Sequence, residues 1–125
     1  MLIAVLRGEP EALSRAIAVL DDPERSFVAS DYLLLEVLPK AIYHRRDREA
    51  QFYQAFFSRA AIWADSTSRE LISLARQQAE TYGLSAVDAL HVASALSVNA
   101  HELVTSEKRT KPIHRVVGLR VLSLA

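Results

Sequence analysis

The stretch SAVDALHVASAL, residues Ser85 to Leu96, decides how the rest of the sequence is interpreted. Its residues are mostly small or apolar, with no glycine or proline among them, and this predicts a helix that lies largely inside the protein. The stretch nevertheless carries Asp88 and, one helical turn later, His91. A carboxylate in a buried helix needs a structural or functional reason, because burying an unpaired charge is costly.

Two interpretations of Asp88 are open from spacing alone. Ser85 and Asp88 have the S-x-x-D spacing of a capping box, and the helix dipole favours an acid in the first turn. Alternatively, Asp88 belongs to a site at the end of a sheet. His91 is within hydrogen-bonding reach of Asp88, but as a lone helical histidine we expect it to have a structural role.

Length and composition indicate one globular domain. The chain has 125 residues, enough for a single core. Lys plus Arg and Asp plus Glu number 15 each, which argues against a general nucleic-acid or membrane coat but not against a local basic patch. The absence of cysteine excludes disulfides and thiolate metal sites. No apolar run reaches the roughly 20 residues that span a bilayer. The opening MLIAVLRG lacks the cationic region of a signal peptide, so we expect a cytoplasmic protein with no membrane partner.

Short apolar runs alternate with helical patterns along the chain. This alternation predicts an α/β fold with a largely parallel sheet, in which the ligand site lies beyond the C-terminal ends of the strands. We expect Pro39 to break or kink its helix. The predicted strands are residues 26–30, 61–64, 102–105 and 119–124. The predicted helices begin at Pro10, at Ser30 or Asp31, near Arg46, at a capping box of Thr67 and Glu70, and at Ser85.

Three acids stand where such a site is expected. Glu36 lies in the helix after the first of these strands, Asp88 in the first turn of the buried helix, and Glu107 two residues after strand 102–105. Clustered carboxylates repel one another unless a cation lies among them, and Mg²⁺ or Mn²⁺ takes such oxygen ligands. Each acid also has a plain structural interpretation. Asp88 can be a cap, Glu36 can pair with Lys40 one turn later, and Glu107 can be solvated in a polar turn.

Two basic clusters follow these acids along the chain. Positive side chains beside an acid site suit an approaching phosphate backbone. The alternative interpretation is that these residues are ordinary solvated charges on the surface. The expected nucleic-acid contacts are Lys40, Arg45 and Arg46 after the Glu36 helix, and Lys108, Arg109 and Lys111 after Glu107.

Taken together, the stretches LIAVLRGEP, LLLEVL, GLSAVDALHVASAL and ELVTSEKR resemble, in this order, the PIN domain, a small α/β nuclease family. The resemblance implies a single PIN-like domain over residues 1–125, built as a three-layer sandwich of a mostly parallel sheet flanked by helices. It implies a ribonuclease that cuts RNA with Mg²⁺ or Mn²⁺ held by acids. It also implies a VapC-type toxin, commonly dimeric and silenced by a small antitoxin protein. By this resemblance, Glu36, Asp88 and Glu107 fall at acid positions of the family motif.

The sequence departs from the family pattern at its start. The family begins with a hydrophobic strand that ends in Asp, whereas Met1 falls inside the segment that should follow. The first family acid is therefore missing, and neither Glu9 nor Glu11 stands at its position. Two explanations are open: the chain as written starts late, or MLIAVL is itself extended and fills the central place in the sheet.

The missing strand and the missing acid each have a further consequence. An unfilled place in the sheet would leave strand edges exposed, so we expect a homo-oligomer such as a dimer. A second function class also stays open, namely a degenerate domain that binds RNA or a protein partner without cutting.

Overall fold

The strands of the protein are parallel throughout the part of the chain that the computed structural model describes, residues 2–5 and 10–125. Strands β1, β4 and β5 form a three-stranded sheet in the order β1-β4-β5, and β2 and β3 form a two-stranded sheet. Strand β2 also lies close to β1. The predicted parallel α/β sheet is confirmed, although it is split in two. The strands are β1 (Leu2–Val5), β2 (Val28–Ala29), β3 (Ile62–Trp63), β4 (Glu102–Thr105) and β5 (Arg120–Ser123).

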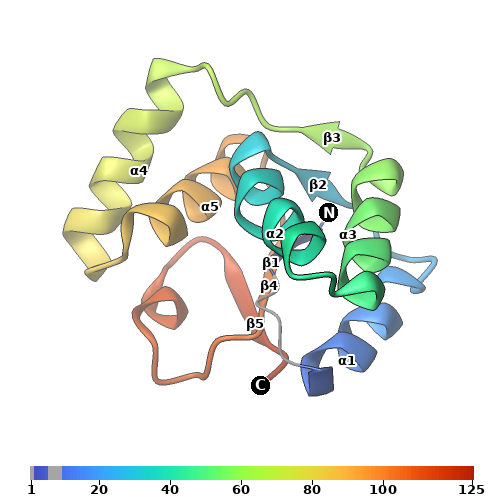
Figure 1. Ribbon diagram of the computed structural model, residues 1–125. Coiled ribbons are helices and arrows are strands. Elements are labelled where there is room, and N and C mark those ends of the chain that lie inside the picture. The colour runs from blue at the N-terminus through green and yellow to red at the C-terminus, as the bar shows by residue number, and fades with distance from the viewer. Residues whose placement is uncertain (1, 6–9) are drawn as a thin grey trace.

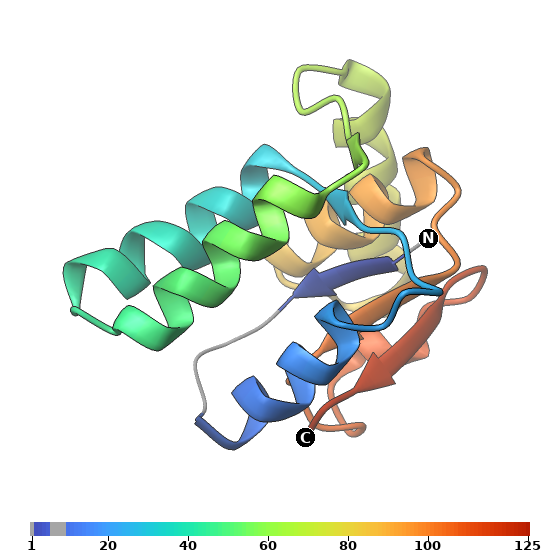
Figure 2. The same cartoon turned by 90° about the vertical axis from the view of Figure 1, so that its right-hand side faces the viewer.

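Helices cover the strands on both sides, which gives the expected layered arrangement. Figures 1 and 2 show the three-stranded sheet between α1 on one side and the α4–α5 pair on the other. Helices α2 and α3 pack side by side as a hairpin (Figure 2). None of the described helices is long and apolar enough to cross a membrane. The helices are α1 (Pro10–Leu20), α2 (Asp31–Tyr43), α3 (Asp47–Arg59), α4 (Arg69–Tyr82), α5 (Ala86–Ser97) and the 3-10 helix η1 (Pro112–Arg115).

The opening apolar segment is extended and joins the sheet. Strand β1 pairs with β4 in the register Leu2↔Glu102 to Val5↔Thr105. The segment is extended, as one of the two explanations expected, but β1 lies at the end of the order β1-β4-β5 and not in the middle of that sheet. Residues 6–9, which include Glu9, lie outside the described ranges.

Helix α2 begins as predicted but passes through its proline. The Oγ of Ser30 accepts a hydrogen bond from the N–H of Leu33 at 3.1 Å, so Ser30 is the N-cap. Pro39 lies inside the helix, which continues to Tyr43, so the predicted break is wrong. Proline removes the hydrogen bond to the carbonyl of Leu35, one turn earlier. Leu35 and Pro39 are both exposed, so water can solvate the freed carbonyl.

The predicted start of α4 is wrong by one residue. Ser68, not Thr67, is the N-cap, because its Oγ accepts from the N–H of Leu71 at 3.3 Å. Thr67 instead bonds Asp65 through its N–H at 3.0 Å and its hydroxyl at 2.7 Å. Adjacent Thr and Ser are both good caps, so only the preceding turn decides between them.

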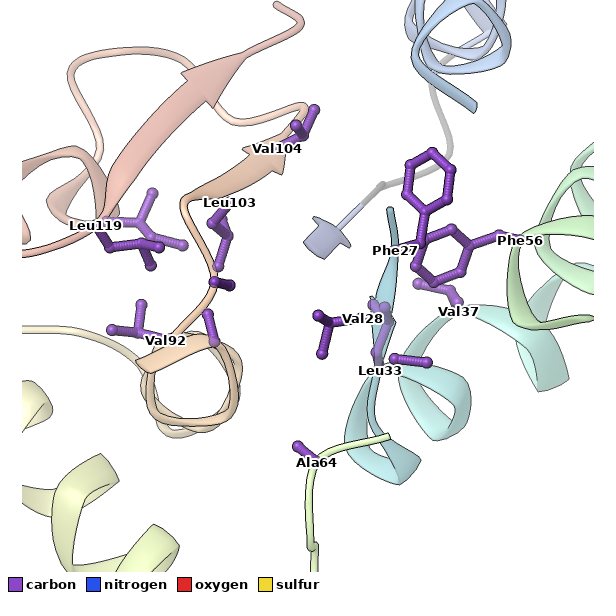
Figure 3. Close-up of a cluster of buried hydrophobic side chains, with 14 of the residues drawn as sticks. Phe27, Val28, Leu33, Val37, Phe56, Ala64, Val92, Leu103, Val104 and Leu119 are labelled. Carbon is purple, nitrogen blue, oxygen red and sulfur yellow. The ribbon is translucent and has the colours of Figure 1, made fainter. Parts of the chain in front are cut away.

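The core joins both sheets to the helices, as Figure 3 shows. Phe27, next to β2, meets Phe56 of α3 edge to face, with ring centroids 5.7 Å apart. On the other side of the core, Val92 of α5 points toward Leu103 of β4, and both are fully buried (Figure 3). The apolar character of the 85–96 stretch is thus explained, because α5 covers the sheet.

Candidate acid site

The first turn of α5 is held by a side-chain cap. The Oγ of Ser85 accepts a hydrogen bond from the N–H of Asp88 at 3.2 Å, which confirms the forward half of the predicted capping box. Asp88 is only 9% exposed. The N-terminal end of the helix dipole favours a carboxylate there. The cap explains the position of Asp88. It uses the backbone N–H of Asp88 and not its carboxylate, so it is compatible with a role of the carboxylate at the end of the sheet.

The course of the chain brings the start of α5 toward the end of β4. Helix and strand are joined by the short link 98–101, so they run in opposite directions. The helix is about 18 Å long at 1.5 Å per residue, and the strand is about 13 Å long at 3.3 Å per residue. The first turn of α5, with Asp88, is therefore directed toward the sheet edge at which β4 ends and Glu107 follows.

Glu36 is joined to α5 through His91. The Oε2 of Glu36 lies 2.5 Å from the Nε2 of His91. The side chain of Glu36 is 14% exposed and that of His91 is 0% exposed. The spacing put Asp88 within reach of His91, but the Nε2 of His91 instead contacts Glu36 on a neighbouring helix. A helix-based prediction favours the partner one turn away, whereas the packing of α2 on α5 supplies a closer one.

Tyr53 of α3 is a third polar group near Glu36. It is buried, and burial, followed by the negative charges of Glu49 and Glu36, raises the pKa of its hydroxyl well above the ordinary value of 10.0. Helices α2, α3 and α5 therefore meet around Glu36. The sequence did not single out Tyr53, because it stands in the aromatic run EAQFYQAFF, where its spacing is that of a core residue.

The backbone at Glu107 is fixed by its neighbours. Its carbonyl accepts from the Oγ of Ser123 at 2.7 Å and contacts the Nε2 of His114 at 3.1 Å. Its N–H donates to the Oγ1 of Thr105 at 3.1 Å. Glu107 is partly buried, so the turn after β4 is built rather than loosely solvated.

The acids have the chemistry for a hard cation, but the described residues do not form a complete metal site. Carboxylate oxygens are the ligands that Mg²⁺ takes. Within residues 2–5 and 10–125, no three His, Asp or Glu side chains are grouped closely enough to hold a metal ion. Glu36 contacts α5 through His91, Asp88 lies in the first turn of α5, and Glu107 lies in the turn after β4. Their convergence on one cation stays a prediction.

The six basic residues expected to contact nucleic acid are all exposed. Lys40, Arg45 and Arg46 lie at the end of α2 and in the turn to α3, and Arg46 is 3.9 Å from Glu49. The other three, Lys108, Arg109 and Lys111, lie between β4 and η1. Exposure permits contact with a phosphate backbone and is equally expected of solvated charges. Their role stays a prediction.

Comparison with known proteins places the chain in a family. Residues 1–117 match the family model described as PIN domain. No curated protein matches the sequence. Several solved structures are similar in fold, and they include three VapBC structures. VapBC from Salmonella typhimurium bound to DNA has a TM-score of 0.63 at 17% identity, covering 100% of both chains.

The other two structures are equally distant in sequence. VapBC2 from Rickettsia felis, bound to a DNA fragment from its promoter, has a TM-score of 0.60 at 17% identity and covers 98% of each chain. VapBC-1 from nontypeable Haemophilus influenzae has a TM-score of 0.58 at 16% identity, covering 99% of this chain and 98% of that one. At this identity the structures show the fold alone. The family match spans most of the sequence, and the chain belongs to the PIN domain family.

Proposed function

We propose that this chain is a metal-dependent endoribonuclease of the VapC toxin type. The observation that carries the proposal is the contact between Glu36 and His91, which joins an acid of α2 to the helix that carries Asp88. Glu36 and His91 are 55 positions apart in the chain, so the contact depends on the packing of the two helices. The family match supports the nuclease class.

In this proposal the three acids Glu36, Asp88 and Glu107 hold Mg²⁺ or Mn²⁺. The bound cation would supply an activated water and would stabilise the charge that develops on the phosphate. The chain contributes the fixed positions of its acids: a capped helix turn for Asp88, a bond to α5 for Glu36 and a braced turn for Glu107.

The exposed basic residues would hold the RNA backbone beside these acids. Lys and Arg neutralise phosphates without reading base sequence, so they position a substrate rather than select it. The residues proposed for this role are Lys40, Arg45, Arg46, Lys108, Arg109 and Lys111.

We also propose a protein partner of the antitoxin class and a homodimer. The partner extends to this chain what the VapBC structures are named for. The dimer extends what the PIN resemblance implies. Leu35, Ile42 and Tyr43, on the outer side of α2, are large, apolar and exposed, which is typical of surfaces that a partner covers. Sedimentation of the chain alone tests the dimer.

Cleavage of a mixed panel of single-stranded RNAs tests the enzyme. The parent chain should cut in Mn²⁺ or Mg²⁺ and should stop cutting in a chelator. Asp88→Asn removes one charge from the proposed site. Glu80→Gln is the matched control, because Glu80 is exposed on α4 beside Arg76. We expect Asp88→Asn to abolish cleavage and Glu80→Gln to leave it unchanged. Cleavage that survives in Asp88→Asn would contradict the proposal.

A second function is supported by one observation. The described residues contain no three-acid group, as expected of a domain that binds RNA or a protein without cutting. In that case the parent chain would bind RNA with no cleavage in any divalent ion. Asp88→Asn would then bind RNA as tightly as the parent.

A further inference from the structure

His91 is a buried histidine of α5. In the described part of the chain, its ring makes one polar contact, which joins α5 to Glu36 of α2. Its side chain is 0% exposed, and its Nε2 lies 2.5 Å from the Oε2 of Glu36. Because its side chain is fully buried, the ring of His91 cannot touch RNA, so a role in the reaction must act through Glu36.

The other ring nitrogen identifies the tautomer. Among the residues that the structure describes, the buried Nδ1 of His91 has no hydrogen-bond partner. A carboxylate only accepts hydrogen bonds, so Nε2 must carry the hydrogen that it donates to Glu36. A second hydrogen on Nδ1 would be left buried without an acceptor, which is costly. The network therefore assigns the Nε2–H tautomer.

We propose that His91 is a positioning residue, whose Nε2–H fixes the direction of the Glu36 carboxylate. The bond holds Oε2 and so sets where the second oxygen, Oε1, points. His91 is also one turn after Asp88 on α5, so the same bond fixes Glu36 relative to Asp88. This inference rests on the proposed function in one respect: that Glu36 takes part in the reaction.

Two amide variants separate positioning from simple packing. The side-chain nitrogen of glutamine reaches about as far from the backbone as Nε2, whereas that of asparagine reaches only as far as Nδ1. His91→Gln should therefore keep the bond to Glu36, and His91→Asn should lose it. Val92→Ala is the control for a cavity in the same helix, because Val92 is fully buried and makes no polar contact.

The first readout is RNA cleavage in Mn²⁺. We expect kcat/KM to fall about 10- to 100-fold in His91→Asn and to stay within about threefold of the parent in His91→Gln, as for other residues that orient a ligand. Equal losses in the two amide variants would overturn the proposal. So would a loss in Val92→Ala as large as that in His91→Asn.

The second readout needs no activity. The carboxyl ¹³C resonance of Glu36, assigned through Glu36→Gln, should shift in His91→Asn and return toward the parent position in His91→Gln. An unchanged resonance in both would overturn the positioning role, whatever the RNA result. If the resonance responds as expected while the parent cuts no RNA, the positioning role stands and the proposed ribonuclease activity fails.

Discussion

Replacing Ser85 with alanine should destabilise the protein by about 1 kcal/mol, within a range of about 0.5–2 kcal/mol for lost N-caps. The Oγ of Ser85 accepts from the N–H of Asp88 at 3.2 Å, and alanine removes that acceptor. Because α5 covers the sheet, the first turn cannot unwind to let water bind this N–H without exposing core residues. For a chain of this size, the loss corresponds to a decrease in Tm of about 3–5 °C.

Urea unfolding of matched variants measures this effect. Ser85→Asn supplies another strong cap and should stay within about 0.5 kcal/mol of the parent. Ser58→Ala, which removes an exposed hydroxyl near the end of α3, should also stay within about 0.5 kcal/mol. If Ser85→Ala is as stable as Ser58→Ala, the cap does not hold the turn that carries Asp88, and the explanation given for its position is wrong.

Three other substitutions test the fold. Phe56→Ala should cost about 3–5 kcal/mol in urea unfolding, because Phe56 is buried against Phe27; a loss below 1 kcal/mol would contradict that packing. Gly83→Ala should lower the free energy of unfolding by about 1 kcal/mol, since Gly83 caps α4 at φ 70°, and a gain would refute this. The raised pKa of Tyr53 gives stability that is fully present below the ordinary pKa of 10.0 and is lost as pH rises above it. Between a pH below 10 and a pH above it, the free energy of unfolding should therefore decline less in Tyr53→Phe than in the parent. Equal declines would contradict the assignment.

Local signals in the sequence predicted most of the fold because they act within one turn of chain. Such signals predict the caps at Ser30 and Ser85, and the Oγ of each accepts a hydrogen bond from a backbone N–H of the following turn. Prediction failed where two local choices were nearly equal in energy. Thr67 and Ser68 are both good caps, and the proline at position 39 lies on a helix face where water can replace the lost hydrogen bond.

The site was less predictable, because its contacts join distant segments. Spacing identified Glu36, Asp88 and Glu107 as acids near strand ends, but it gave no distance between them. Spacing offers Lys40, one turn away, as one possible partner of Glu36, whereas the structure supplies His91 of another helix. Only the packing of α2 on α5 determines that pair. For the same reason, the convergence of all three acids stays a prediction.

The most direct test of the central claim is a double-variant cycle on RNA cleavage in Mn²⁺, using Glu36→Gln, Glu107→Gln and the two together. If the acids serve one site, each single variant should lose most of the activity, and the double variant should be no worse than the poorer single one. Normal cleavage by Glu107→Gln, or losses that multiply in the double variant, would contradict a shared site.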